Sequence, residues 1–203
     1  LSGAGNYLDD VTMPNLAHGA MLYSLHAHAR LLSVDTVLAV QTKGVLAVYT
    51  AEDLAAAGLG EIVMRATVKN HDDTPQAKPS RPILADGRVR FVGDAIAFVV
   101  AETKEVAREA AELIDVDVEL LPAVIDPIAA LDAGAPQVWD EVPGNLCVDF
   151  AAGDPEGVDA AFAAAAHITR VDILNQRVSV VPLEPRGAIG EYDPGSSSFT
   201  LTT

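Results

Sequence analysis

The sequence is poor in cysteine and in positive charge. A single cysteine, Cys147, stands among 203 residues, so no disulfide can form within the chain and a reducing compartment is expected. There are 13 Lys and Arg against 29 Asp and Glu, for a formal net charge of -16. That charge repels phosphate backbones and anionic lipid surfaces, which argues against a nucleic-acid partner and favours a solvated surface.

Long apolar runs are also missing. No window approaches the roughly 18 continuous apolar residues of a membrane span, and the start LSGAGNYLDD lacks the basic end and apolar run of a signal peptide. These absences favour a cytoplasmic protein. Because the first residue is not Met, a mature or trimmed segment is one interpretation, and periplasmic export together with a partner stays open.

The motifs of several enzyme classes are absent too. The chain has no G-x-G-x-x-G or G-x-x-x-x-G-K-[ST] phosphate loop, no G-x-S-x-G and no H-E-x-x-H. Cys147 has an acidic neighbour and no nearby His to stabilise a thiolate, so we expect no catalytic or metal-binding role for it. His26 and His28 share one face of a strand, but two ligands are too few for a metal site. We interpret them as surface histidines beside a turn.

Two pairs of charged residues are candidates for binding. Arg88 and Arg90 could hold an anionic ligand, but we favour ion pairs with Asp86 or Asp94 at the entrance of a strand. These pairs would make both arginines structural.

The second pair is Glu184 and Arg186, in the apolar segment VVPLEPRGAIGEYD. Apolar neighbours predict that Glu184 is desolvated and that Arg186 neutralises it. We favour a structural tie at a corner that Pro182 and Pro185 fix. The alternative is that Glu184 and Arg186 form the wall of a substrate pocket, and a catalytic acid/base role for Glu184 would make the chain a small independent enzyme.

Half of the residues are hydrophobic, which predicts packed cores. In the first part of the chain, β-rich runs alternate with helical patterns. Strands are predicted at 19–25, 29–36, 44–50, 90–101 and 116–122, the fourth being central in its sheet and opened by a turn or bulge at Gly93-Asp94. Helices are predicted after Thr50, after Thr103 and over 126–134, and residues 61–80 are expected to form an exposed loop.

In the helix after Thr103, the apolar positions recur at helical spacing and predict a face that covers a sheet: Val106, Ala110, Leu113 and Ile114. Irregular sequence over 133–154 then predicts a linker between a first domain, 1–132, and the start of a second, 155–203. In the second domain we expect a helix over 157–166, one strand or two joined by a bend over 167–181, and two strands over 187–193 and 199–203. The sequence stops inside the last of these strands, so we expect its continuation elsewhere.

Several segments in register carry a resemblance to a known family: GNYLDDV, YSLHAHARLLSVD, GRVRFVGDAIAFVVAE, APQVWDEVPGNLC and NQRVSVVPLEPRGAIGEYD. Their order is similar to the start of the molybdopterin-binding large subunit of the xanthine dehydrogenase, aldehyde oxidase and carbon monoxide dehydrogenase family. The resemblance implies an α/β (α+β) hammerhead domain followed by the first strands of a molybdenum-cofactor-binding domain. Where Leu25 stands, the family more often has proline.

The resemblance also implies a function for the whole large subunit. It would be a molybdenum hydroxylase, an oxidoreductase that holds molybdenum on molybdopterin, often as the cytosine dinucleotide. Electrons would leave through [2Fe-2S] clusters to FAD on small and medium partner subunits, in a homo-dimer of heterotrimers. The family's cofactor-contacting and catalytic residues come after position 203, so no catalytic, metal or cofactor-binding residue is assigned and this segment alone is expected to bind no cofactor and to be inactive.

The resemblance leaves the substrate open among carbon monoxide, aldehydes, purines and other N-heterocycles. The rival hypothesis is a free-standing interaction module with the hammerhead fold and no redox activity.

Overall fold

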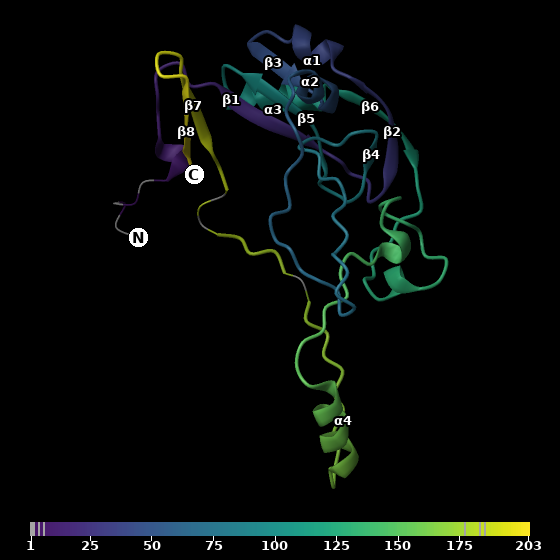
Figure 1. The fold of residues 1–203 in the computed structure, drawn as a ribbon. Coiled ribbons are helices and arrows are strands. Elements are labelled where there is room, and N and C mark those ends of the chain that lie inside the picture. The colour runs from purple at the N-terminus through teal and green to yellow at the C-terminus, as the bar shows by residue number, and fades with distance from the viewer. Residues whose placement is uncertain (1–2, 4, 6, 177, 183, 185) are drawn as a thin grey trace. The chain divides into compact units, whose positions relative to one another are not determined.

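The structure is a computed structural model that describes all residues except 1, 2, 4, 6, 177, 183 and 185 (Figure 1). The chain divides into two compact units. One comprises residues 17–153, and the other combines residues 1–16 with residues 154–203. Each unit has its own helical and strand elements.

The unit 17–153 contains two three-stranded antiparallel sheets, in the orders β1-β5-β3 and β4-β2-β6. The strands are β1 (His18–Tyr23), β2 (Ala29–Asp35), β3 (Val45–Tyr49), β4 (Arg88–Val89), β5 (Ala95–Ala101) and β6 (Asp115–Leu120). The predicted central position of β5 is confirmed. Gly93, with φ of +93°, lies in the turn before β5, and its N–H donates to the Ser24 carbonyl at 2.8 Å.

Three helices accompany the sheets: α1 (Val37–Gln41), α2 (Ala51–Ala56) and α3 (Lys104–Glu112). The predicted caps are confirmed. The Asp53 carboxylate accepts from the Thr50 N–H at 2.7 Å, and the Thr103 hydroxyl accepts from the Val106 N–H at 3.2 Å. Each bond gives an acceptor to a backbone N–H at the start of a helix, because no carbonyl of a preceding helical turn is available there.

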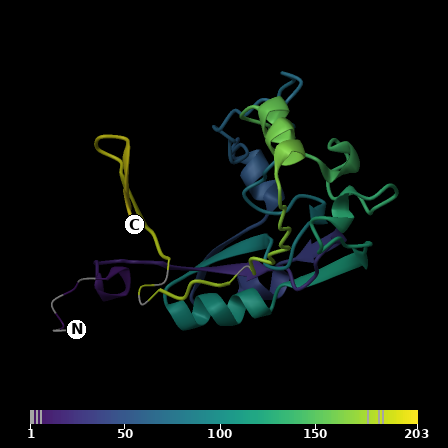
Figure 2. The same ribbon diagram turned by 90° about the horizontal axis from the view of Figure 1, so that it is seen from below.

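Helix α3 packs along β1 and β5, as Figure 2 shows. Its predicted sheet-facing side is confirmed for Ala110 and Ile114, which are buried, but Leu113 is 44% exposed. Ala107 and Ala111 are buried in addition. Small side chains let the helix approach the sheet closely, whereas the bulky Leu113 stands just after the helix, at its C-cap, and points away from the core.

The unit 17–153 has two clusters of buried residues. One gathers Ala39, Ala97, Val99, Ala110, Ala111 and Ile114, and the other Ala29, Ala85, Val89 and Ile96. The half-buried side chains of Leu22, Val34 and Val116 pack against both clusters. The two sheets therefore share one continuous apolar interior, to which β5 contributes Ile96, Ala97 and Val99.

Residues 61–80 form a loop, as predicted, with a single isolated bridge between Lys69 and Pro75. The loop is held by its own side chains. The Gln76 amide oxygen accepts from the Val68 N–H at 2.9 Å, and the Asn70 amide nitrogen donates to the Thr74 hydroxyl at 2.9 Å. These side-chain hydrogen bonds stand in for the regular backbone hydrogen bonds that helices and strands have and this loop lacks.

The helix predicted over 126–134 is wrong in extent. Only residues Ala129–Leu131 form a 3-10 helix, and the Asp126 carboxylate accepts from the N–H groups of Ile128 and Ala129. Ile125 and Ile128 are 90% and 79% exposed. A short helix depends on packing an apolar face, and this segment buries none.

In the unit of residues 1–16 and 154–203, α4 (Pro155–Ala164) and the hairpin of β7 (Ile189–Asp193) with β8 (Ser198–Thr202) confirm the predicted helix and final strands. The Asp154 carboxylate caps α4 by accepting from the Gly157 N–H at 2.9 Å.

The strand predicted over 167–181 is wrong. None of the described residues in this segment, 167–176 and 178–181, belongs to a strand, and Ile173 and Val181 are 84% and 87% exposed. The side chains suit a strand, but a strand also needs a neighbouring backbone to hydrogen-bond, and the described residues supply none here.

Candidate functional sites

Glu184 and Arg186, the residues expected at a structural corner, are both exposed. The Glu184 carboxylate accepts from the Leu8 N–H at 3.1 Å, within the unit of residues 1–16 and 154–203. Among the described residues, no ion pair joins Glu184 to Arg186, so the predicted desolvation and neutralisation of Glu184 are wrong. Pro185 lies outside the described residues.

The exposure of both side chains to water explains why Glu184 and Arg186 do not pair. A hydrated carboxylate and a hydrated guanidinium gain little by pairing, and holding both side chains costs entropy. Glu184 instead fixes the first turn of the 3-10 helix Leu8–Asp10, whose leading N–H has no acceptor within the helix. Gly187 lies at the same corner, where a side chain would come within 3.4 Å of Leu8. Glu184 thus ties two distant parts of the chain together.

Arg88 and Arg90 lie at β4 and just after it, and both contact the segment around Trp139. Arg88 makes an ion pair with Asp140 at 3.1 Å, and the Arg90 guanidinium lies 3.7 Å from the centre of the Trp139 ring. The expected pairing with Asp86 is therefore wrong. Asp94 does contact Arg90, but its carboxylate accepts from the Arg90 backbone N–H at 3.0 Å.

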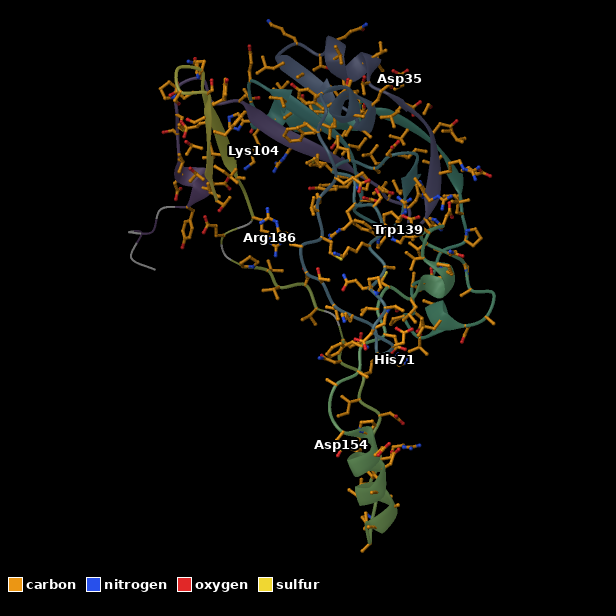
Figure 3. All side chains as sticks on the ribbon, viewed as in Figure 1. Asp35, His71, Lys104, Trp139, Asp154 and Arg186 are labelled. Carbon is orange, nitrogen blue, oxygen red and sulfur yellow. The ribbon has the colours of Figure 1, made fainter. Side chains whose placement is uncertain are left out.

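These partners could not be read from spacing, because Arg88 and Asp140 are 52 residues apart. The contacts fasten the irregular segment around Trp139 to the edge of the sheet β4-β2-β6. Trp139, labelled in Figure 3, offers the Arg90 cation the face of its ring, which carries partial negative charge.

The Arg90 guanidinium is poorly supplied with acceptors. Its Nε is buried and has no hydrogen-bond partner, and its Nη1 donates to the Arg88 carbonyl at 3.4 Å, a long contact. Burial lowers the pKa of Arg90, and the nearby charge of Arg88 lowers it further. Carboxylates of Glu141, Asp94 and Asp140 offset part of this effect.

A cavity of about 350 Å³ opens beside Arg90 and Trp139. Its other lining residues come from α2, from the segment after α2 and from the segment before β4: Ala51, Leu54, Ala55, Leu59, Gly60, Glu61, Ser80, Pro82, Ile83, Leu84 and Asp86. The lining presents polar and apolar surface in about equal parts. Sequence reasoning missed this cavity, because its walls come from three separate segments.

His26 is exposed, as predicted, but the expectation that His28 is a surface residue is wrong. His28 is 7% exposed, and its Nδ1 lies 2.7 Å from the Pro122 carbonyl oxygen. Its Nε2 is buried without a partner. The chain after β6 covers this ring, and that covering could not be read from the turn in which His28 stands.

A further polar cluster links the loop 61–80 to residues near Cys147. The Nδ1 of His71 lies 3.0 Å from an Asp149 carboxylate oxygen, and the His71 N–H donates to the Asp149 carbonyl at 2.7 Å. The Asn70 amide oxygen accepts from the Asp149 N–H at 2.8 Å. Hydrogen bonds from Thr74 lower the pKa of Asp72 beside this cluster. The cluster docks a loop and was not predicted.

Metal-ligating side chains stay dispersed in the described part of the chain. Within those residues, no group of three or more His, Cys, Asp or Glu side chains could hold a metal ion. Cys147 is half-buried, and its carbonyl accepts from the Ala77 N–H at 2.8 Å. Over the same residues, no helix is long and apolar enough to cross a membrane.

Comparison with protein families matches two parts of the chain. Residues 2–122 match the family model described as aldehyde oxidase and xanthine dehydrogenase, a/b hammerhead domain, and residues 138–203 match a molybdopterin cofactor-binding domain. The two matches follow each other in the order that the sequence predicts.

Individual relatives agree. The chain is 35% identical to the carbon monoxide dehydrogenase large chain of Afipia carboxidovorans over 98% of its own length, and 31% identical to the nicotine 6-hydroxylase large subunit of Paenarthrobacter nicotinovorans over 95%. The structure superimposes on quinoline 2-oxidoreductase from Pseudomonas putida 86 with a TM-score of 0.85 and 33% identity, over 98% of this chain and 24% of that one. The chain spans 25% and 23% of the length of the two curated relatives.

Proposed function

This chain belongs to the molybdopterin-binding large subunits of the xanthine dehydrogenase, aldehyde oxidase and carbon monoxide dehydrogenase family, and we propose that it is the amino-terminal scaffold of a molybdenum hydroxylase. The observation that carries the proposal is the pair of family matches in sequence, hammerhead domain first and cofactor-binding domain second. The chain is homologous to the amino-terminal region of large subunits, and its fold is the mixed α and β fold that the resemblance implies.

We propose the boundaries 1–132 for the hammerhead domain, 133–154 for the linker and 155–203 for the start of the cofactor-binding domain. Irregular structure over the middle range supports the linker, since a 3-10 helix at Pro143–Asn145 is the longest regular element among its residues. Asn145 stabilises that segment by accepting from the Val138 N–H at 2.9 Å and donating to the Ala130 carbonyl at 2.9 Å.

The residues present do not fit a complete molybdopterin site. In the described part of 155–203, residues 165–176 and 178–182 are exposed coil, and no cluster of metal-ligating side chains gathers there. We propose that molybdopterin, as the cytosine dinucleotide, is held by parts of the large subunit other than this segment, and that this segment alone has no turnover.

The partners we propose follow the family's organisation: the rest of the molybdenum subunit, an iron–sulfur small subunit with [2Fe-2S] clusters and an FAD medium subunit, in a homo-dimer of heterotrimers. The names of several relatives, among them "large chain" and "large subunit", support a multisubunit assembly. A cytoplasmic location is part of the proposal. The low proportion of cations argues against nucleic acid as a further partner.

Glu184 and Arg186 remain our proposed wall of a substrate pocket in the complete subunit. Glu184 is held in place by Leu8, and Arg186 next to it is exposed and could face a ligand. Glu184→Gln in the assembled enzyme should then raise KM with little change in kcat. Unchanged kinetics in Glu184→Gln, together with a lower melting temperature in Glu184→Ala, would mean that Glu184 only ties the corner.

Metal analysis tests the main proposal. The purified 203-residue chain should contain no molybdenum and oxidise none of carbon monoxide, aldehydes, purines or N-heterocycles. Stoichiometric molybdenum in this chain alone would overturn it. Sequencing the gene beyond the codon for Thr203 separates the enzyme from a free-standing interaction module, because a reading frame that runs on into a Gly-rich cofactor loop is expected only for the enzyme.

A further inference from the structure

We propose that the cavity between α2 and Trp139 binds a small carboxylic acid with an apolar tail, and that Arg90 holds its carboxylate. The inference goes beyond the scaffold role, because it assigns a ligand site to the hammerhead unit itself. It depends on the cavity, on the unsatisfied guanidinium and on the arrangement of charges around both.

The size and lining of the cavity suit such a ligand. Its volume of about 350 Å³ falls within the range of small-molecule sites, and its lining is polar and apolar in about equal parts, which matches a ligand with a charged head and an apolar tail. Leu54, Leu59 and Ile83 supply apolar walls, and Trp139 supplies a flat one. A branched aliphatic tail would bury its surface against these side chains, which is favourable in water.

Arg90 is the cation in that lining and has donors to offer. The Nε is buried and has no accessible surface, so the donors open to a ligand are those at the end of the guanidinium, where the bond from Nη1 to the Arg88 carbonyl is long at 3.4 Å. A carboxylate can accept from two guanidinium N–H groups at once. Trp139 holds the guanidinium plane, so a bound acid would meet a positioned fork.

The acidic residues nearby are already engaged or exposed. The Glu61 carboxylate accepts from the Ser80 hydroxyl, and that of Asp94 accepts from the Arg90 backbone N–H. Asp140 pairs with Arg88, and Asp86 is exposed. No ion pair of the Arg90 guanidinium is found among the described residues, although the charges of Glu141, Asp94 and Asp140 offset part of the lowering of its pKa by burial. An incoming carboxylate would supply a direct ion pair.

Calorimetric titration of 4-methylpentanoate into the purified protein, with any subunits that co-purify, tests the site. The expected Kd is about 0.1 to 10 mM for a ligand of this size. The neutral 4-methylpentanamide has the same tail and should bind at least tenfold more weakly, because it carries no charge for Arg90.

Three variants locate the binding. Arg90→Gln should weaken binding of the acid at least tenfold, whereas Arg81→Gln, which removes the same charge from an exposed neighbour outside the lining, should leave it unchanged. If Arg90→Gln does not fold, Ala55→Phe decides. Ala55 is an exposed lining residue of α2, so a larger side chain there should block the cavity without disturbing the core.

The outcomes separate clearly. Loss of binding in Arg90→Gln or Ala55→Phe, with wild-type affinity in Arg81→Gln, supports the site. No heat with the acid, equal binding of the amide, or unchanged affinity in Arg90→Gln and Ala55→Phe would overturn it, since the acid would then bind elsewhere or not at all. None of these results depends on molybdenum or turnover, so the scaffold proposal can fail or succeed separately.

Discussion

Gly19, on strand β1, gives the sharpest stability prediction. A methyl group at this position would lie 2.4 Å from Cζ and 2.6 Å from Cε2 of Phe98 on the neighbouring strand β5. Non-bonded carbon atoms normally approach to about 3.5 to 4.0 Å. In Gly19→Ala the Phe98 ring must therefore withdraw by more than about 1 Å from its contact with the β1 backbone.

The expected loss of stability is moderate. Overpacking of this kind costs about 1 to 3 kcal/mol, and replacing glycine by alanine restores about 0.4 to 1 kcal/mol by restricting the unfolded chain. The net change in the free energy of unfolding should be a destabilisation of up to about 2.6 kcal/mol, with a middle value of about 1.3 kcal/mol. Because Phe98 is half-buried, its ring has some room to turn, which keeps the figure from being larger.

Trp139 provides the assay. It is the single tryptophan of the chain and lies in the unit 17–153, so its fluorescence during urea denaturation reports on that unit. Gly60→Ala is the matched control. A methyl group there meets nothing within 4 Å, so the variant should be as stable as the wild type or slightly more stable.

A double-mutant cycle decides the mechanism. If the Phe98 ring causes the loss, Gly19→Ala should cost little once Phe98 is replaced by alanine, with a coupling energy of about 1 to 2 kcal/mol. Additive effects of Gly19→Ala and Phe98→Ala, or a Gly19→Ala variant as stable as Gly60→Ala, would refute the reasoning.

Three further predictions follow from single hydrogen bonds. Thr103→Ala removes the cap of α3 and should cost about 1 kcal/mol by urea denaturation, with Thr103→Ser restoring most of it. Glu184→Gln keeps an acceptor for Leu8, so proteolysis of the first residues should stay slow, whereas Glu184→Ala should accelerate it. The Ser196 hydroxyl and the Gly195 N–H lower the pKa of Asp193 below 3.8, so the hairpin gains stability above that pH and loses it as pH falls through the lower value. In an NMR titration, Ser196→Ala should return the pKa of Asp193 toward 3.8, and an unchanged pKa would exclude the hydroxyl as its main cause.

Local chemistry explains which elements were predictable. Thr50 and Thr103 each make their capping hydrogen bond with a residue three positions along the chain. Strand β5 is a continuous apolar run that follows a turn at Gly93. Each of these signals is complete within a short window of sequence. The family resemblance added the order of the domains, because it compares the whole chain at once.

The wrong predictions have the opposite cause. Each concerns a residue whose partner lies far along the chain, or a segment that finds no partner among the described residues. His28 is buried because residues near Pro122 cover it, and Arg88 pairs with Asp140 rather than with Asp86. The run over 167–181 has β-forming side chains, yet its described residues find no strand to pair with. Side-chain type predicts what a segment can form, and only its partners determine whether it does.

The same distinction bears on function. Several polar side chains in the unit 17–153 fasten a loop: Asn70, Gln76 and Asn145 each bond to backbone groups of irregular segments. Among the described residues, two buried side-chain nitrogens lack a partner, Nε2 of His28 and Nε of Arg90. His28 does not line the cavity between α2 and Trp139, whereas Arg90 does. A guanidinium that lines open space and has no ion pair among the described residues can take up a carboxylate without giving up an existing ion pair, and this is why we assign the binding site to Arg90.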